Sequence, residues 1–337
     1  MNAVSARTLS PIKKRVPNAI EAVQQRTYDV SVKRQSGERP SVHRARERAM
    51  ERRFRIYHLS VLRQIHAQHK PFYRFSRAGR TDRVFSANTS ALMLPKDVRR
   101  TLFAGFHEID LSSAHLCIAA SLWDAAIARE RLESAGYVIW DDLLKHLFPA
   151  IRDVYADDLY DAVKAACKIA VYSTVYGMGR HSIHGKLALR LCHVLDDRDA
   201  GTEAARLFMQ HPVVSDLLDA RDGELATIQT QGGAEAADGR FIPLPTEHGN
   251  PAASVLATVA QSYEQALMSV LVEYEQDRDA DLSRNRFRVC LWLHDGAYVK
   301  MRHPRARMKD LNARLEARAE ELGVIARFDH EEIQTND

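Results

Sequence analysis

Two short apolar segments that each carry an aspartate are separated by a long helical stretch, and this order constrains the fold most. The segment FAGFHEIDLS (103–112) has the composition of a buried strand and carries Asp110 near its end. The segments RFRVCLWLH (286–294) and AYVKMR (297–302) are typical of the two strands of a hairpin, with Asp295 at its tip. Strands separated by long helical insertions predict an α+β fold. We expect an antiparallel sheet that holds both aspartates and a helical lobe formed by the sequence between them.

Each aspartate also has an ordinary structural explanation. Asp is common immediately before a helix, and residues 113–128 have a helical pattern, so Asp110 fits an N-cap. Asp295 and Gly296 form the pair favoured in a two-residue type I′ hairpin turn. In the alternative, the two carboxylates meet at one end of the sheet and bind a pair of Mg²⁺ ions, with the backbone carbonyl of Leu111 as a further oxygen ligand.

One helix between the strands carries a cationic and aromatic face. In DLYDAVKAACKIAVYSTVYGM (158–178), Lys164, Lys168, Tyr172 and Tyr176 recur every four residues and therefore share one broad face. Such a face suits a triphosphate at one end and a base or sugar ring at the other. It also fits a plain amphipathic helix with tyrosines at its edge. The opposite side carries residues suited to packing, namely Ala166, Ile169, Ala170 and Val171.

The composition predicts a globular protein of the reducing cytoplasm. The chain has 337 residues and 45% hydrophobic residues, enough for a sizeable core. No stretch approaches 18 consecutive apolar residues and the N-terminus has no secretory signal, so we expect no membrane contact. The cysteines are scattered and lack the spacing of a zinc site or a disulfide framework, namely Cys117, Cys167, Cys192 and Cys290.

The charge is distributed unevenly along the chain. Residues 1–56 carry 14 Lys and Arg against five acidic residues, which gives a net charge of +9. The whole chain has a net charge of +4, so the remainder carries −5. A basic segment on a nearly neutral body suits a polyanionic partner such as a nucleic acid. The alternative is a solvated tail, partly disordered over residues 1–40.

The three segments resemble motifs A, B and C of the family A DNA polymerases. Residues 110–116 (DLSSAHL) correspond to a family string of the type Asp-Tyr-Ser-Gln-Ile-Glu-Leu. Residues 168–177 match Lys-x₃-(Phe/Tyr)-x₃-Tyr-Gly without a gap. Residues 294–296 (HDG) correspond to His-Asp-Glu. Two weaker matches follow the family order, namely Arg80 before motif A, and GRFIPLP (239–245) followed by Gln261 between motifs B and C.

The resemblance implies roles for the nucleotide site. Asp110 and Asp295 would be catalytic and would hold two Mg²⁺ ions, for which Mn²⁺ can substitute. Lys168 would contact the incoming triphosphate and protonate the leaving pyrophosphate. The other nucleotide-binding candidates are Lys164, on the phosphates; Tyr172, stacked on the nucleotide; and Tyr176, His115 and Gly177, which line the insertion pocket.

Primer–template contacts are also implied. Arg80 and Gln261 would contact the minor groove, Arg240 in the 239–245 match would contact primer–template, and His294 would support the primer end. The implied architecture is a right-hand polymerase fold with an antiparallel-sheet palm, helical fingers and a reduced helical thumb. Its expected parts are a basic, flexible arm (1–45), a thumb-like helical region (46–77), the first palm part (78–128), the fingers (129–230) and the second palm part (231–337).

Departures from the family leave several functions open. His115 replaces a glutamate that helps to exclude a ribose 2′-hydroxyl, and Gly296 replaces the second acid of motif C. The leading hypothesis is a primer-extending, DNA-dependent DNA polymerase of a phage or plasmid, in a bacterial or phage-infected cytoplasm. With only about 75 residues before Arg80, we expect no proofreading exonuclease domain. Alternatives are a single-subunit RNA polymerase or primase that uses rNTPs, a sugar-tolerant polymerase, a degenerate primer–template-binding module, and an unrelated α+β protein. The sequence does not determine the oligomeric state.

Overall fold

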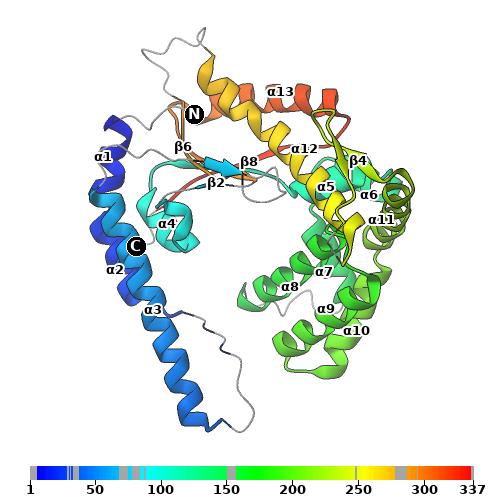
Figure 1. Ribbon diagram of the computed structural model, residues 1–337, viewed down its shortest axis with the longest axis horizontal. Coiled ribbons are helices and arrows are strands. Elements are labelled where there is room, and N and C mark those ends of the chain that lie inside the picture. The colour runs from blue at the N-terminus through cyan, green and yellow to red at the C-terminus, as the bar shows by residue number, and fades with distance from the viewer. Residues whose placement is uncertain are drawn as a thin grey trace.

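The computed structural model divides into a four-stranded sheet with its covering helices, a helical lobe, and a group of N-terminal helices (Figure 1). It describes residues 6–28, 30, 32, 38–67, 75–77, 84–86, 89–149, 157–246, 249–277, 287–293 and 295–334.

The sheet contains the two aspartate-bearing segments that the sequence predicts. Its strands are β3 (His107–Leu111), β6 (Arg288–Trp292), β7 (Gly296–Lys300) and β8 (Phe328–Glu332). They pair antiparallel in the order β6-β7-β3-β8. The sheet therefore joins segments that are far apart in the sequence, as expected for an α+β fold.

The last strand begins later than the sequence pattern indicates. The sequence pattern predicts a short strand over residues 324–329, but β8 starts at Phe328. The reason is the end of the preceding helix, where Gly323 adopts a positive φ of 67° and the Val324 N–H donates to the Ala319 carbonyl. Val324 therefore belongs to the turn that ends α13, and β8 begins after it.

Helices cover one face of the sheet. The helices α5 (Ala114–Leu122), α12 (Pro251–Gln276) and α13 (Pro304–Leu322) pack there around Ile109 and Val299. Figure 1 shows α12 and α13 lying across the sheet. On the opposite face, Phe106 and Tyr298 pack with α4 (Lys96–Leu102) and the N-terminal helices. Asp110 shares this second face, because side chains alternate along a strand.

The described part of the segment predicted as a flexible arm contains helices. The helices α1 (Ala6–Lys14) and α2 (Val16–Gln25) precede α3 (Pro40–Ala67), and α3 agrees with the helical pattern of residues 43–69. Pro17 lies in the first turn of α2, where a missing N–H costs no helical hydrogen bond. The buried stripe Val16, Ala19 and Val23 packs against the C-terminal part of α3 and against α4. Spacing of three and four residues therefore outweighs the basic, proline-containing composition.

The remaining elements form the helical lobe and its connections. The helix expected at 113–128 is interrupted, because Asp124 adopts a positive φ of 55° between α5 and α6. The elements are β1 (Phe75–Arg77), β2 (Val84–Ser86), η1 (Ala91–Met93), α6 (Ala126–Glu133), α7 (Ile139–Leu147), α8 (Asp157–Val175), α9 (Arg180–Leu195), α10 (Arg198–Gln210), α11 (Pro212–Gln231), β4 (Gly233–Glu235) and β5 (Phe241–Pro243). Across the described parts of the chain, no helix is long and apolar enough to span a membrane.

A glycine joins the lobe to the helix that covers the sheet. Gly177 follows α8 with a φ of +76°, and a Cβ added there would lie 2.6 Å from the Ala253 Cβ on α12. We expect Gly177→Ala to lower the free energy of unfolding by about 2–4 kcal/mol, from left-handed strain plus overpacking. Chemical denaturation measures this change.

The matched control is Gly136→Ala. Gly136 has nearly the same φ, +75°, but a Cβ there would meet nothing within 4 Å. We expect this variant to lose only the strain contribution, about 1–2 kcal/mol. Equal losses in the two variants would show that the contact with Ala253 is unimportant.

Candidate active site

The structure brings Asp110 and Asp295 together at one end of the sheet. Asp110 lies within β3, and the N-cap position of α5 is Ser113, so the N-cap explanation of Asp110 is wrong. The Leu111 N–H donates to the Asp295 carbonyl oxygen at 2.8 Å, which fixes the end of β3 beside the residue that precedes β7. Burial, and then the negative charge of Asp295, raises the pKa of Asp110 to about 7.

Gly296 lies in β7 and does not form the expected Asp-Gly turn. It pairs with Asp110, and neither Asp295 nor Gly296 has the positive φ that a type I′ turn requires. A Cβ at Gly296 would lie 2.6 Å from the Ile109 carbonyl oxygen and 2.7 Å from Asp110 Oδ1. The close approach of β3 and β7 therefore explains why this position holds glycine and leaves no space for an acidic side chain.

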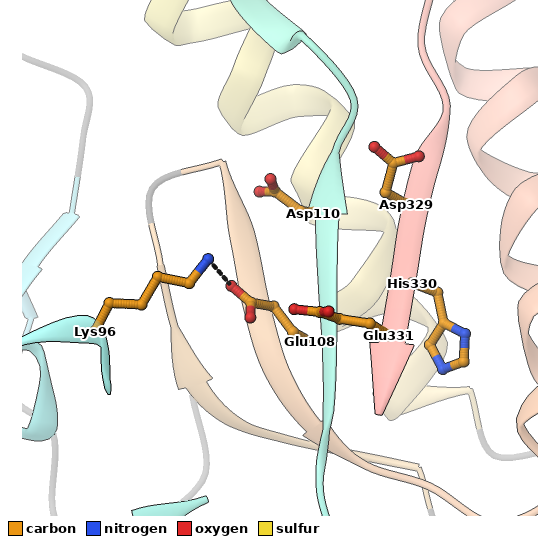
Figure 2. Close-up of a pocket in the computed structure, with 6 residues that line it drawn as sticks. All are labelled: Lys96, Glu108, Asp110, Asp329, His330 and Glu331. Atoms are coloured by element: carbon orange, nitrogen blue, oxygen red, sulfur yellow. Dashed lines mark ion pairs between the residues drawn. The ribbon is translucent and has the colours of Figure 1, made fainter. Parts of the chain in front are cut away.

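Further carboxylates lie on the same face as Asp110. Asp329 on β8 pairs directly with Asp110, and Glu331 pairs with Glu108. With Lys96 and His330 they line a hollow of about 210 Å³ (Figure 2). Glu108 is neutralised by Lys96 at 3.4 Å and by Arg100 at 2.7 Å, whereas Asp110 and Asp329 form no ion pair with another described residue. The predicted site did not include Asp329, because this residue lies in none of the three matched motifs.

Tyr172 from the helical lobe lies near enough to the aspartates for their charges to affect its pKa. Burial, and then the charges of Asp295 and Asp110, raises the pKa of Tyr172 to about 12. The ring of His115 lies edge-on to Tyr172 at 6.4 Å and to Tyr176 at 5.3 Å, measured between ring centroids. The end of α8, the start of α5 and the sheet thus form one site.

The two lysines of α8 precede these tyrosines along the helix. Lys168 is exposed, and its Nζ lies 5.4 Å from the centroid of the Trp140 ring. Lys164 Nζ lies 5.3 Å from the Tyr160 ring. At 1.5 Å of rise per residue, Lys168 is about 6 Å from Tyr172 along the helix axis. Ile169, which we expected to pack, is 42% exposed, so the apolar face is narrower than predicted.

The primer–template candidates are placed only in part. Gln261 is half-buried on α12. Arg240 is exposed at the start of β5 and lies 3.5 Å from Asp238, in a hairpin held to α12 by the Ala237 N–H bonded to Ser262. No described contact joins Arg240 to the two aspartates. Arg80 and His294 lie outside the described residues.

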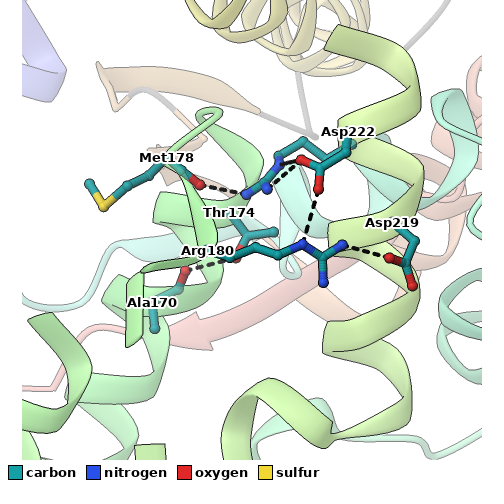
Figure 3. A network of polar contacts seen from close by, with 7 residues as sticks. Ala170, Thr174, Met178, Arg180, Asp219 and Asp222 are labelled. Carbon is teal, nitrogen blue, oxygen red and sulfur yellow. Dashed lines mark hydrogen bonds and ion pairs between the residues drawn. The ribbon is translucent and has the colours of Figure 1, made fainter. Parts of the chain in front are cut away.

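A polar network, absent from the sequence predictions, fixes the end of α8 to α11. Arg221 is 2% exposed and donates to the Met178 carbonyl at 2.5 Å, and it also pairs with Asp222. Arg180 binds Asp219 and Asp222 at 2.6 and 3.0 Å (Figure 3). The network fixes the turn after Gly177, and therefore the direction in which the tyrosine-bearing turns of α8 point.

The raised pKa of Asp110 predicts a pH dependence of stability in the absence of divalent metal. Its native pKa is about 7 against an ordinary value of 3.8, so the native state holds a proton that the unfolded state releases in this window. Stability from this group is therefore full below about pH 4 and lost as the pH rises to 7, by at most about 4 kcal/mol. Urea unfolding between pH 4 and 8 measures it, and Asp110→Asn is expected to flatten the profile.

Two neighbouring carboxylates provide the control for this effect. Asp295 raises the pKa of Asp110 more than Asp329 does. We therefore expect Asp295→Asn to shift the wild-type profile further than Asp329→Asn, and both toward lower pH. A profile that moves equally in both variants, or in neither, would contradict the electrostatic origin of the shift.

Comparison with solved structures identifies the fold. No protein-family model matches the chain, and a search of curated proteins also gives no match. The chain is similar to the POL domain of Pol1 from M. smegmatis, solved in complex with DNA primer-template and dNTP, with a TM-score of 0.61 at 14% identity. The match covers 98% of this chain and 66% of that chain. This protein has a polymerase-domain fold. The α+β fold with antiparallel pairing is confirmed.

Proposed function

We propose that the protein is a template-directed nucleotidyltransferase, and specifically a DNA-dependent DNA polymerase that extends a primer. The observation that carries the proposal is the position of Asp110 and Asp295, from segments far apart in sequence, at the same end of the sheet, where the Leu111 N–H donates to the Asp295 carbonyl and both charges act on Tyr172 of the lobe. The similar Pol1 domain was solved with primer-template and dNTP, which supports the same classes of ligand here. In this proposal the sheet is the palm, α6 to α11 are the fingers, and α3 is a reduced thumb.

The two aspartates suit divalent cations. Over the described ranges, no three or more His, Cys, Asp and Glu side chains group to enclose a metal ion. Mg²⁺ is ordinarily held by one or two carboxylates, with water and substrate phosphates completing its shell. Asp110 and Asp295 supply such an open set of oxygens, and the charge repulsion that raises the pKa of Asp110 would be relieved by a cation. The residues therefore fit two Mg²⁺ ions, or Mn²⁺ in their place, with the Leu111 carbonyl as a further ligand.

Each of the candidate residues would then have a separate role in the reaction. Bound Mg²⁺ supplies Lewis-acid stabilisation of charge on the transferring phosphoryl group. Asp110 and Asp295 would hold the primer end and the triphosphate in position at the end of the sheet. The rigid sheet limits the motion of the two carboxylates. Lys168 and Lys164 bind the triphosphate, and Lys168 donates a proton to the leaving pyrophosphate. Tyr172 stacks on the incoming nucleotide.

The N-terminal half of α3 is proposed to bind the nucleic-acid backbone. This half projects away from the rest of the molecule (Figure 1) and exposes Arg44, Arg48 and Arg52 at four-residue spacing. Phe54 and Tyr57 on the same helix are 43% and 46% exposed. Arginines neutralise phosphates, and aromatic rings stack on unpaired bases.

A second candidate is an RNA polymerase, primase or sugar-tolerant enzyme. It is favoured by His115 and by Gly296, where the family A motifs have acids. A non-catalytic primer–template-binding module is a further alternative, which the two paired aspartates disfavour because binding alone does not need them.

Primer extension distinguishes these functions. A labelled primer is annealed to DNA and to RNA templates and offered dNTPs or rNTPs separately, with Mg²⁺. Extension by dNTPs on DNA is the expected result. Extension by rNTPs alone would establish the second candidate. Tight primer–template binding without extension, under every pairing and with Mn²⁺ as well, would overturn the proposed activity in favour of the binding module.

A further inference from the structure

A chain of three polar side chains, two of them buried, lies beside Tyr172. His115 and Glu264 are each 2% exposed, and His115 Nε2 lies 2.5 Å from Glu264 Oε2. The other ring nitrogen of His115, Nδ1, lies 2.5 Å from the Tyr176 hydroxyl. The three residues come from α5, α12 and α8, so the chain links the sheet-covering helices to the lobe.

The carboxylate sets the orientation of the imidazole. An ionised Glu264 can only accept, so His115 Nε2 carries a hydrogen and donates it. The other ring nitrogen, Nδ1, shares a hydrogen bond with the Tyr176 hydroxyl. A carboxylate behind a histidine fixes its tautomer and ring direction, as in many metal and catalytic sites. Glu264 thereby also fixes the Tyr176 hydroxyl.

The position of this chain relates it to the sugar of a bound nucleotide. Tyr172 lies one helical turn before Tyr176 and close to both aspartates, and its ring also contacts His115. A nucleotide stacked on Tyr172 with its phosphates at the aspartates places its sugar beside His115 and Tyr176. This step rests on the proposed function.

We propose that Glu264 is a positioning residue for sugar selection, holding His115 and Tyr176 as a fixed wall that leaves no space for a ribose 2′-hydroxyl. The carboxylate that motif A lacks at residue 115 is thereby supplied from α12. Two short hydrogen bonds hold these side chains in place, so a ribose 2′-hydroxyl cannot push them aside and the ribonucleotide is excluded. Removal of Glu264 takes away the acceptor that holds His115 Nε2, so the wall loses one of these two hydrogen bonds.

The test is the ratio of kcat/KM for dATP to kcat/KM for ATP in primer extension. Glu264→Ala is expected to lower this ratio about tenfold or more, mainly through a higher kcat/KM for ATP. Glu264→Gln keeps the volume and is expected to lower it less. The double variant Glu264→Ala with His115→Glu returns a carboxylate to α5 and is expected to recover discrimination. A purely structural role would weaken both nucleotides equally and leave the ratio unchanged.

Glu275→Gln is the matched control on the same helix. It breaks an ion pair with Arg288 at 3.0 Å, away from the nucleotide site, and should leave the ratio unchanged. Active Glu264 variants with wild-type ratios would overturn this inference and leave the proposed function standing. If wild type extends with neither nucleotide, the proposed function fails. The inference is then decided by the ratio of dATP to ATP binding constants, measured calorimetrically in wild type and Glu264→Gln.

Discussion

Asp295→Ala is expected to abolish primer extension, with kcat reduced about 10³-fold or more. Removal of one of two metal-binding carboxylates forfeits several kcal/mol of charge stabilisation in phosphoryl transfer, and each 1.4 kcal/mol is about tenfold in rate. Asp110→Ala is expected to have an effect of the same size, because in the proposed mechanism the two carboxylates bind the same ions. Single-turnover extension of a labelled primer with dNTPs measures both.

The control for this prediction lies in the same sheet. Glu332 on β8 pairs with His107 and is exposed, at a position remote from Asp110. Glu332→Ala should extend primers at close to the wild-type rate. Fluorescence anisotropy should show that Asp295→Ala still binds primer–template, which separates loss of chemistry from loss of binding. An Asp295→Ala variant that extends normally would refute the assigned site.

The periodic parts of the fold could be predicted from sequence. The bounds of α12 and α13 agree with the apolar spacing over 251–276 and 304–322, because long helices reveal their buried face repeatedly. The β6–β7 hairpin was found for a similar reason, since two apolar runs flank one short polar break. The predicted position of the turn in this hairpin was wrong by one residue. Local sequence does not reveal a one-residue change of register. Here the register places Gly296 in β7, where it closely approaches β3.

The site could be predicted only where its residues follow each other in a motif. Asp110, Tyr172, Tyr176 and His115 were predicted in this way, and the structure brings them near one another. Glu264 was not, because its partner lies in another helix and nothing adjacent marks it. One signal was present. Glu264 occupies a position of α12 that its apolar neighbours, Ala260, Leu267, Met268 and Leu271, share, and a carboxylate on an apolar stripe requires a buried partner.

The buried contact of Arg221 in the helical lobe could not be predicted from the sequence either. Arg221 is buried although it is an arginine, and it donates to the backbone carbonyl of Met178. Backbone acceptors leave no trace in a side-chain pattern, so such a contact is found only after the fold is known. The catalytic roles proposed for single residues are therefore tested by the kinetics of variants.

Lys168→Ala is expected to reduce kcat for dNTP incorporation about 10²-fold or more, the usual contribution of a positioned proton donor. Lys168 is exposed and contacts Trp140 only through a cation–π interaction, which is worth about 0.5–1 kcal/mol at such a site. The variant should therefore fold with nearly wild-type stability, and its lost activity should reflect chemistry. Lys168→Arg retains the charge but is a poorer proton donor, so it should recover nucleotide KM more than kcat.

Lys186→Ala provides the comparison, since Lys186 is an exposed lysine on the adjacent helix α9. Its removal should leave both kcat and KM for dNTPs close to wild type. Loss of activity in both lysine variants would indicate a general electrostatic effect of the lobe on nucleic acid, and it would be relieved by lower salt. Loss in Lys168→Ala alone, at every salt concentration, places this side chain on the triphosphate. An active Lys168→Ala would remove the lysine from the mechanism and leave the two aspartates as its catalytic residues.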